Sequence, residues 1–335
     1  MGIAKKTPTI YDVAELSGVS ITTISRVLNG SEKVNPATRG RVLDAIDKLA
    51  FIPKAEARAR ALQKTRRIGV ISPFFTAPSF VQRLRGIAGA LSRTDYELVI
   101  YTVDSLERLH SHLSSLPLRG NIDGLIIISL PVHDQQIKRL QQHAVPTVLI
   151  EYPNRGLNSV EIDDVSGGRI AAEYLVRKGH TRLAFLGDTH PPKYAIHPAS
   201  LRQKGFRAAV QSAGISLPAA YVCSAPNATE PTRQVAKELL TMRRPPTAIF
   251  AASDIQALIV LKVAHQLGIE VPGELAIVGF DDLDMAEYED LTTVSQHLDE
   301  SGQLAVDILI SHMEDGVRPL QHIKIPLTLI ERRTA

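Results

Sequence analysis

The segment Thr9–Gly30, TIYDVAELSGVSITTISRVLNG, constrains the fold more than any other part of this 335-residue chain. Its apolar residues Ile10, Val13 and Ala14 recur at the intervals of a helix. Gly18 then stands where a tight turn needs a small residue that can adopt positive φ. The pattern predicts two short helices joined by a tight turn. An ordinary three-helix domain is the alternative, because such patterns also arise by chance.

The second of these helices is predicted to begin after Ser20, whose hydroxyl can cap its first turn. Ile24, Val27 and Leu28 share one face of this helix and are expected to enter the core. The opposite face is polar, as expected for a surface that enters a DNA groove. A third amphipathic helix is predicted over Pro36–Leu49, with inward side chains at Val42, Leu43, Ile46 and Leu49.

The basic side chains are concentrated near the start of the chain. Residues 1–67 carry 13 Lys+Arg against 6 Asp+Glu, a net charge of +7, which leaves −4 for the remainder of a chain whose total is +3. A basic amino-terminal part on a mildly acidic body is suited to contact DNA phosphates at one end only.

The sequence YDVAELSGVSITTISRVLNG, followed by VNPATRGRVLDAIDKLAFIP, resembles the headpiece of the lactose/galactose repressor (LacI/GalR) family of bacterial transcription regulators. In that family the second helix lies in the major groove. The resemblance implies that base edges are contacted by Ile21, Thr22 and Arg26, and arginine can pair bidentately with guanine. It implies contacts to the DNA backbone by Thr9, Ser20, Thr23, Ser25 and Asn29. For each of the hydroxyl groups, helix capping or solvation is the alternative.

The stretch Pro53–Leu62, PKAEARARAL, resembles the family's hinge helix, which usually inserts a leucine into the minor groove seven residues after the proline. Here Arg60 stands at that position, on the same segment as Ala57 and Ala61, and Leu62 comes two residues too late to share its helical angle. An apolar wedge kinks DNA by unstacking a base step, whereas arginine favours a narrow, electronegative minor groove. The segment is therefore expected to respond to groove width. A plain charged linker is the alternative.

From Arg67 onward, short apolar runs alternate with helical patterns. The runs predicted as strands are IGVI, ELVIYTV, DGLIIIS, PTVLIE, TRLAFLG, TAIFAAS and LAIVGF. The segments predicted as helices include Phe80–Leu91, Gly168–Lys178, Gly205–Ala213 and Gln256–Leu267. This alternation predicts parallel sheets with helices on both faces, and 268 residues are too many for one compact core. Two doubly wound α/β lobes are therefore expected, with ligands bound outside the carboxyl ends of the strands, in a cleft between the lobes.

Three motifs extend the resemblance over essentially the whole chain: YLVRKGHTRLAFLG from Tyr174, Arg202-x-x-Gly-Phe, and VPGELAIVGFDD from Val271. They are similar to the periplasmic-binding-protein-like core of the same family. The implied organisation is an all-α helix-turn-helix headpiece (residues 1–52), a hinge helix or linker (53–67) and an α/β core of two doubly wound lobes (68–335). The amino-terminal lobe is expected at about residues 68–162 and 298–322, and the carboxyl-terminal lobe at about 163–295 and 323–335.

The resemblance also implies an effector site between the lobes. Glu151 and Asp281 end predicted strands and are expected to accept hydrogen bonds from ligand hydroxyls, while Arg202 donates to ligand oxygens. The other expected contacts are Phe74, Ser129, Ser253 and Gln296, with Tyr152, Tyr194 and Phe280 as further apolar walls. A turn or helix cap is the alternative for the carboxylates, a structural salt bridge for Arg202, and core packing for the aromatic residues.

The combined prediction is a ligand-gated transcriptional repressor that reads a near-palindromic DNA operator as a homodimer and binds a small-molecule effector, expected to be a sugar. The amino terminus has no apolar signal core and the chain has no apolar run long enough to span a bilayer, so a cytoplasmic protein without membrane contact is expected. The single cysteine, Cys223, permits no internal disulfide and is expected to be a buried, inert thiol.

Two other classes of protein share some of these features. A solute-binding protein for transport has such lobes but needs an export signal and no basic headpiece. A sugar or nucleoside enzyme needs an acid/base pair, which Glu151 and Asp281 could imitate. The sequence has no Walker loop, G-x-S-x-G or H-E-x-x-H, so no catalysis, cofactor or metal is expected. Mass spectrometry of sugars incubated with the protein separates binding from conversion.

Overall fold

The computed structural model describes residues 8–28, 33–49, 51, 65–119, 121–152, 154–189, 192–226, 228–314 and 319–335. The chain forms two compact units, Met1–Thr65 and Arg66–Ala335. Among the helices of the described segments, none combines the length and the apolar character that a membrane crossing requires.

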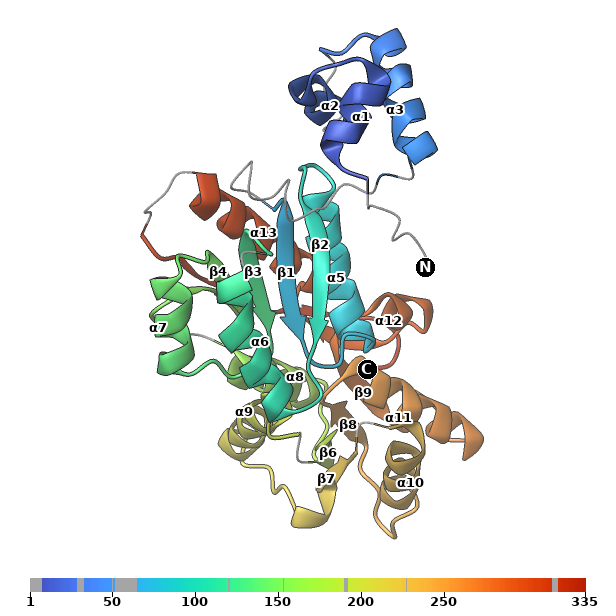
Figure 1. Ribbon diagram of the computed structural model, residues 1–335. Helices are drawn as coiled ribbons and strands as arrows, with labels where there is room; N and C mark the ends of the chain where they lie inside the picture. The colour runs from blue at the N-terminus through green and yellow to red at the C-terminus, as the bar shows by residue number, and fades with distance from the viewer. Residues whose placement is uncertain are drawn as a thin grey trace, which may run out of the picture. The chain divides into compact units, whose positions relative to one another are not determined.

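The described residues of the first unit form three helices, α1 (Ile10–Ser17), α2 (Ile21–Leu28) and α3 (Pro36–Leu49) (Figure 1). Gly18 ends α1 in the left-handed region at φ 67°, as a tight turn between helices requires. The backbone N–H of Thr23 donates to Ser20 Oγ over 3.2 Å, so Ser20 caps α2. The predicted helix-turn-helix is therefore confirmed.

One residue that was predicted to face the core of this unit is exposed instead. Leu43 is 46% exposed, whereas Val42 and Ala45 are buried and Ile46 and Leu49 pack against them. Positions 42, 45, 46 and 49 follow the spacing of a single helical stripe, and Leu43 lies about 100° away from Val42 around the helix.

The second unit contains two six-stranded sheets, each flanked by helices on both faces (Figure 1). The first sheet has the strand order β11-β5-β4-β3-β1-β2. Its strands are β1 (Arg67–Ser72), β2 (Glu97–Thr102), β3 (Gly124–Ile128), β4 (Thr147–Ile150), β5 (Asn158–Glu161) and β11 (His322–Lys324). One face packs against α5 (Pro78–Leu91) and α13 (Leu298–Glu314), and the other against α6 (Leu106–Arg119) and α7 (Asp134–Gln142). This sheet with its helices is the first lobe.

The second sheet has the order β12-β10-β9-β8-β6-β7. Its strands are β6 (Leu183–Asp188), β7 (Val222–Ala225), β8 (Ala248–Ala251), β9 (Ala276–Asp281), β10 (Thr292–Ser295) and β12 (Thr328–Ile330). One face packs against α8 (Asp164–Arg177) and α9 (Pro198–Ser212), and the other against α10 (Thr229–Leu240) and α11 (Asp254–Gln266). The short helices η1 (Ala219–Tyr221) and α12 (Asp284–Tyr288) complete this second lobe. The predicted α/β class is confirmed, with β12 antiparallel to β10 while the other paired strands are parallel.

The chain passes between the lobes three times, after β5, after β10 and after β11. The third passage lies within two residues of the lobe boundary expected at about residues 322 and 323. Because β11 pairs in parallel with β5 from His322 to Lys324, the chain leaves the first lobe only after Lys324. A strand of three residues with the sequence HIK gives no apolar run that would place it in a sheet from sequence alone.

Candidate functional site

Helix α2 carries the residues expected to contact DNA bases. Ile24 and Val27 are buried in the core of the first unit. Thr22 and Arg26 are exposed, and Ile21 is 38% exposed although it is apolar. The helix has no acidic residue that would repel phosphates. Its exposed face therefore presents a hydroxyl, a guanidinium and an aliphatic group, which suit base edges and the thymine methyl group.

Some of the residues expected to contact the DNA backbone have local partners. Thr9 Oγ1 donates to Asp12 Oδ2 over 2.7 Å at the start of α1, and Ser20 Oγ lies 3.0 Å from Thr23 Oγ1. Ser25 is half-buried. Asn29 and the hinge residues Ala57, Arg60 and Ala61 lie outside the described residues.

In the second unit, a hydrogen-bonded network spans the two lobes. On the first lobe, Arg83 of α5 donates from Nη2 to Glu151 Oε1 over 2.5 Å and from Nε to Ser301 Oγ over 2.9 Å. Ser129 Oγ donates to the other oxygen of Glu151. Arg83 is only 2% exposed, so this ion pair is buried.

Gln296 connects this part of the network to the second lobe. Its Oε1 accepts from Arg83 Nη2 over 3.3 Å, and its Nε2 donates to Asp281 Oδ1 over 2.5 Å. Asp281 lies 3.8 Å from Arg202 Nη1, and Arg202 Nε donates to Asp164 Oδ1 over 2.8 Å. Residues from both lobes therefore form one continuous buried polar chain at their interface.

Burial and charge act against each other on the acidic groups of this network. Burial raises the pKa of Glu151, but Arg83, Ser129 and Arg202 outweigh it, so its pKa lies below the ordinary value. Burial raises the pKa of Asp164 despite the charge of Arg202. Burial also raises the pKa of Asp281 to about 7, against the same guanidinium and the Gln296 hydrogen bond. The network thus holds a carboxyl group that titrates near neutral pH.

Close helix crossings position the two arginines. At the α8·α9 crossing, a Cβ on Gly168 would lie 1.8 Å from the carbonyl oxygen of Arg202, and one on Gly205 would lie 1.8 Å from the carbonyl oxygen of Val165. At the α5·α13 crossing, a Cβ on Gly302 would lie 2.3 Å from the carbonyl oxygen of Arg83. Only glycine permits these approaches, which bring both arginines to the lobe interface.

The structure brings Ser129, Glu151, Arg202, Asp281 and Gln296 together, and uses Ser253 differently. Ser253 caps α11, because its Oγ accepts from the backbone N–H of Gln256 over 3.3 Å. The other five residues bond to one another and to neighbouring protein groups, such as the carbonyl oxygen of Ala252, which accepts from Arg202 Nη1 over 2.6 Å.

The aromatic residues fall into two groups. Phe74 is 42% exposed, and its ring centroid lies 6.0 Å from that of Phe80 and 6.2 Å from that of Tyr194 in the second lobe. Tyr152 packs with Tyr194 against the core of the first lobe. Phe280 is fully buried, with the Arg202 guanidinium 3.6 Å from its ring centroid. Phe280 therefore supports Arg202 through a cation–π contact.

Sequence reasoning missed Arg83 and Asp164. Arg83 lies four residues before Ile87 and seven before Ala90, on the buried stripe of α5, and a charged residue on an apolar stripe was an available signal. Asp164 is the first residue of α8, where an acidic residue is ordinarily explained as a favourable interaction with the helix dipole.

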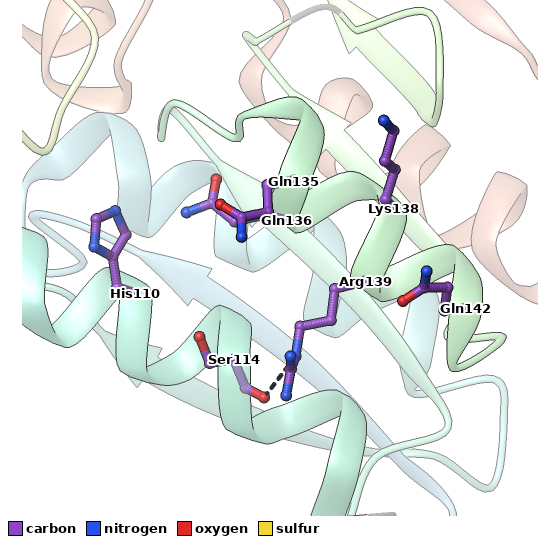
Figure 2. Close-up of a pocket in the computed structure, with 7 residues that line it drawn as sticks. All are labelled: His110, Ser114, Gln135, Gln136, Lys138, Arg139 and Gln142. Carbon is purple, nitrogen blue, oxygen red and sulfur yellow. Dashed lines mark hydrogen bonds between the residues drawn. The ribbon is translucent and has the colours of Figure 1, made fainter.

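A separate polar hollow of about 460 Å³ lies on the first lobe between α6 and α7 (Figure 2). Its lining side chains are polar or basic and none is acidic: His110, Ser114, Gln135, Gln136, Lys138, Arg139 and Gln142. Arg139 Nε donates to the Ser114 carbonyl over 3.1 Å, and Gln136 Oε1 accepts from the His133 N–H over 2.7 Å. These two side chains therefore already hold α7 in place, and none of the expected effector residues lines the hollow.

No group of three or more His, Cys, Asp or Glu in the described part of the chain is placed to hold a metal ion. Cys223 is half-buried rather than fully buried, and burial raises the pKa of its thiol. A raised pKa reduces the thiolate fraction at neutral pH and hence the reactivity of this side chain.

Known proteins share this arrangement. Residues 9–54 match the family described as bacterial regulatory proteins, lacI family, and residues 172–335 match the periplasmic binding protein-like domain. The ribose operon repressor of Escherichia coli (strain K12) is 32% identical over 333 residues, which cover 98% of this chain and 99% of the relative.

Two solved structures of regulators resemble the chain. The lac repressor dimer bound to operator and the anti-inducer ONPF has a TM-score of 0.76 at 27% identity, and the match covers 98% of this chain and 99% of that one. A LacI family transcriptional regulator from Enterococcus faecium with bound ribose has a TM-score of 0.69 at 26% identity, covering 80% of this chain and 98% of that one.

A helix-turn-helix headpiece followed by a two-lobed α/β core with a buried polar interface defines an effector-controlled, DNA-binding transcription regulator. The chain belongs to the lacI family of bacterial regulatory proteins.

Proposed function

We propose that this protein is a repressor that binds a near-palindromic operator as a homodimer and responds to a sugar held between its lobes. The observation that carries the proposal is the polar network from Ser129 through Gln296 to Arg202, which joins donors and acceptors of both lobes in a buried interface. An effector that replaces some of these bonds favours one arrangement of the lobes, and it controls DNA binding through its different affinity for the two states.

The DNA-binding part of the proposal assigns base contacts to Ile21, Thr22 and Arg26, and backbone contacts to Thr23 and the neighbouring hydroxyl groups. Operator sequences are selected from a randomised pool with the wild type, Arg26→Ala and Thr23→Ala. Arg26→Ala is expected to relax the preference at one base position in each half-site, at a cost of about 1–3 kcal/mol. Thr23→Ala is expected to weaken binding to all sequences alike. An unchanged sequence preference for Arg26→Ala would remove its base-reading role.

The hinge part of the proposal assigns Arg60 to the minor groove at the operator centre, on the sequence alone. Arginine favours a narrow, A·T-rich groove, so Arg60→Leu is expected to move the central preference toward a kinkable C·G step and to reduce the salt dependence of binding. Selection with both proteins at two salt concentrations measures this. Identical central preferences and salt slopes would show that the hinge acts only as a tether.

The effector part of the proposal is supported by the regulator from Enterococcus faecium with bound ribose. Sugar hydroxyls both donate and accept, and the network offers carboxylates, guanidinium groups and an amide for them. In a thermal-shift screen of sugars, the effector is expected to stabilise the wild type, and Arg202→Ala to abolish that shift while unliganded operator binding persists. An undiminished shift in Arg202→Ala would exclude this site.

The remaining parts of the proposal concern assembly and location. The lac repressor neighbour is a dimer, which supports a homodimer here. Relatives named as a ribose operon repressor and as a transcriptional regulator support a cytoplasmic protein that binds its effector without converting it. Sedimentation gives the assembly state, and mass spectrometry of the recovered effector gives its fate.

A further inference from the structure

Three polar residues next to the network are not used by it. Asp188 is the last residue of β6, His197 immediately precedes α9, and Gln256 is the third residue of α11. All three therefore lie at the carboxyl edge of the second sheet, where ligands bind in folds of this class. Gln256 is 1% exposed, and its Nε2 donates to Asp188 Oδ1 over 2.9 Å.

This corner contains buried polar atoms without partners. Among the described residues, Gln256 Oε1 and His197 Nε2 are two of only three buried side-chain polar atoms that lack a hydrogen bond. Buried polar atoms are nearly always paired, because leaving one unpaired costs free energy. An acceptor on Gln256 and a ring nitrogen on His197 are therefore available to a group that the protein itself does not supply.

The corner is electrostatically part of the lobe interface. Burial raises the pKa of Asp188, and the charges of Arg202 and His197 oppose this shift only in part. The charge of Arg202 also acts on Glu151 and Asp164, so Asp188 shares the field of the polar network. Among the described residues, the carboxyl groups of Glu151, Asp164, Asp188 and Asp281 outnumber the guanidinium groups of Arg83 and Arg202 at this interface, and the buried carboxyl group of Asp254 lies close enough to Asp281 to interact with it. A further negative charge is unfavourable here, because buried charges interact strongly.

We propose that Asp188, His197 and Gln256 form a corner of the effector site that accepts hydrogen bonds from hydroxyl groups of an uncharged sugar and discriminates against sugar phosphates and sugar acids. The inference rests on the proposed effector function and specifies the class of ligand. Asp188 and Gln256 Oε1 accept from the sugar, and His197 Nε2 donates or accepts according to its tautomer. At Asp188 and Gln256 Oε1, a phosphate or carboxylate would place acceptors against acceptors, so this corner disfavours an anionic ligand.

The test measures affinity by calorimetry for six probes: D-ribose, D-ribose 5-phosphate, D-ribonate, D-glucose, D-glucose 6-phosphate and D-gluconate. The full-length wild type is expected to bind at least one neutral sugar and to bind its anionic partners at least 10-fold more weakly. Gln256→Met and Asp188→Asn are each expected to lower the affinity for the neutral sugar at least 10-fold. Asp188→Asn is also expected to reduce the difference in affinity between each neutral sugar and its anionic derivatives. Gln266→Met, an exposed position on the same helix, is the matched control and is expected to bind as the wild type does.

The outcomes separate this inference from the function on which it rests. If Arg202→Ala loses the sugar while Gln256→Met and Asp188→Asn keep wild-type affinity, the corner is wrong and the effector site stands. If Arg202→Ala also keeps the wild-type affinity for the sugar, the proposed effector site and the corner within it are both wrong. Tighter binding of an anionic probe than of its neutral parent, or no binding of either neutral sugar, overturns the inference. Unfolding curves without ligand check that each variant is folded.

Discussion

Arg83 and Arg202 occupy corresponding positions in the two lobes. Each begins an R-x-x-G sequence, Arg83-Leu-Arg-Gly86 on α5 and Arg202-Gln-Lys-Gly205 on α9, and these helices follow the corresponding strands β1 and β6 of the two sheets. In each case the glycine lies at a close crossing with a second helix. The same local arrangement of an arginine and a glycine therefore places one guanidinium from each lobe at the shared interface. There, Gln296 connects Arg83 to Asp281, which lies next to Arg202.

The first prediction concerns the glycine crossings. A Cβ on Gly205 would meet the carbonyl oxygen of Val165, and backbone cannot move aside as a flexible side chain can. Gly205→Ala is expected to lower the free energy of unfolding by about 1–3 kcal/mol or more. Gly89→Ala is the control, because nothing lies within 4 Å of a Cβ there, and it is expected to raise stability by about 0.5–1 kcal/mol. Urea denaturation measures both, and equal effects would contradict the role of the crossing.

The second prediction concerns the buried ion pair of Arg83 and Glu151. Arg83→Met is expected to cost about 3–5 kcal/mol of unfolding free energy, because it leaves the Glu151 carboxylate buried without its cation. Adding Glu151→Gln removes that charge and is expected to recover part of the lost unfolding free energy. Arg85→Met is the control two residues away. Its ion pairs to Asp284 and Asp299 are about half exposed, so its loss is expected to cost at most about 1 kcal/mol.

A similar loss for Arg83→Met and Arg85→Met would show that the lobe interface does not depend on the buried pair. A double variant no more stable than Arg83→Met alone would show that the uncompensated charge of Glu151 is not the cause of the loss. Double-mutant analysis of the unfolding free energies distinguishes these results.

The sequence predicted the headpiece and the class of the core because their signals are local. Gly18, the Ser20 cap and the apolar face of α2 lie within one segment, and each acts on its immediate neighbours. The core helices were predicted too short at their amino ends: α8 begins at Asp164 and α9 at Pro198, ahead of the predicted Gly168 and Gly205. The first turns of these helices, DVSG and PASL, each carry a single large apolar residue, so hydrophobic periodicity does not mark where the helices begin.

The site was harder to predict because its residues depend on long-range packing. Ser129 and Glu151 are 22 residues apart, whereas Arg83 and Gln296 are 213 residues apart. The place of Arg83 on an apolar stripe is a local signal that it is unusual, but only the close crossing of its helix with α13, a long-range contact, shows that its guanidinium is buried at the lobe interface. The corner at Asp188 and Gln256 was missed for the same reason, since its donor and acceptor are 68 residues apart and meet only at the edge of the folded sheet.

The last prediction concerns pH. The pKa of Asp281 is raised to about 7 in the folded protein by burial, whereas an aspartate in the unfolded chain titrates near about 3.9. Between these values the native state binds more protons than the unfolded state, so this group makes the free energy of unfolding fall as the pH rises. Full titration of Asp281 lowers the free energy of unfolding by up to about 4 kcal/mol.

Asp281→Asn retains an acceptor for Gln296 Nε2 and has no such titration. Urea unfolding of both proteins at intervals between pH 4.5 and 7.5 is expected to give a shallower pH dependence for the variant. Asp164 and Asp188, whose pKa values burial also raises, remain in both proteins. Burial and the charge of Asp281 raise the pKa of the neighbouring Asp254, so the comparison gives the contribution of Asp281 together with its effect on Asp254. Parallel curves would mean that Asp281 is already ionised in the folded protein over this range, with the adjacent Arg202 outweighing its burial.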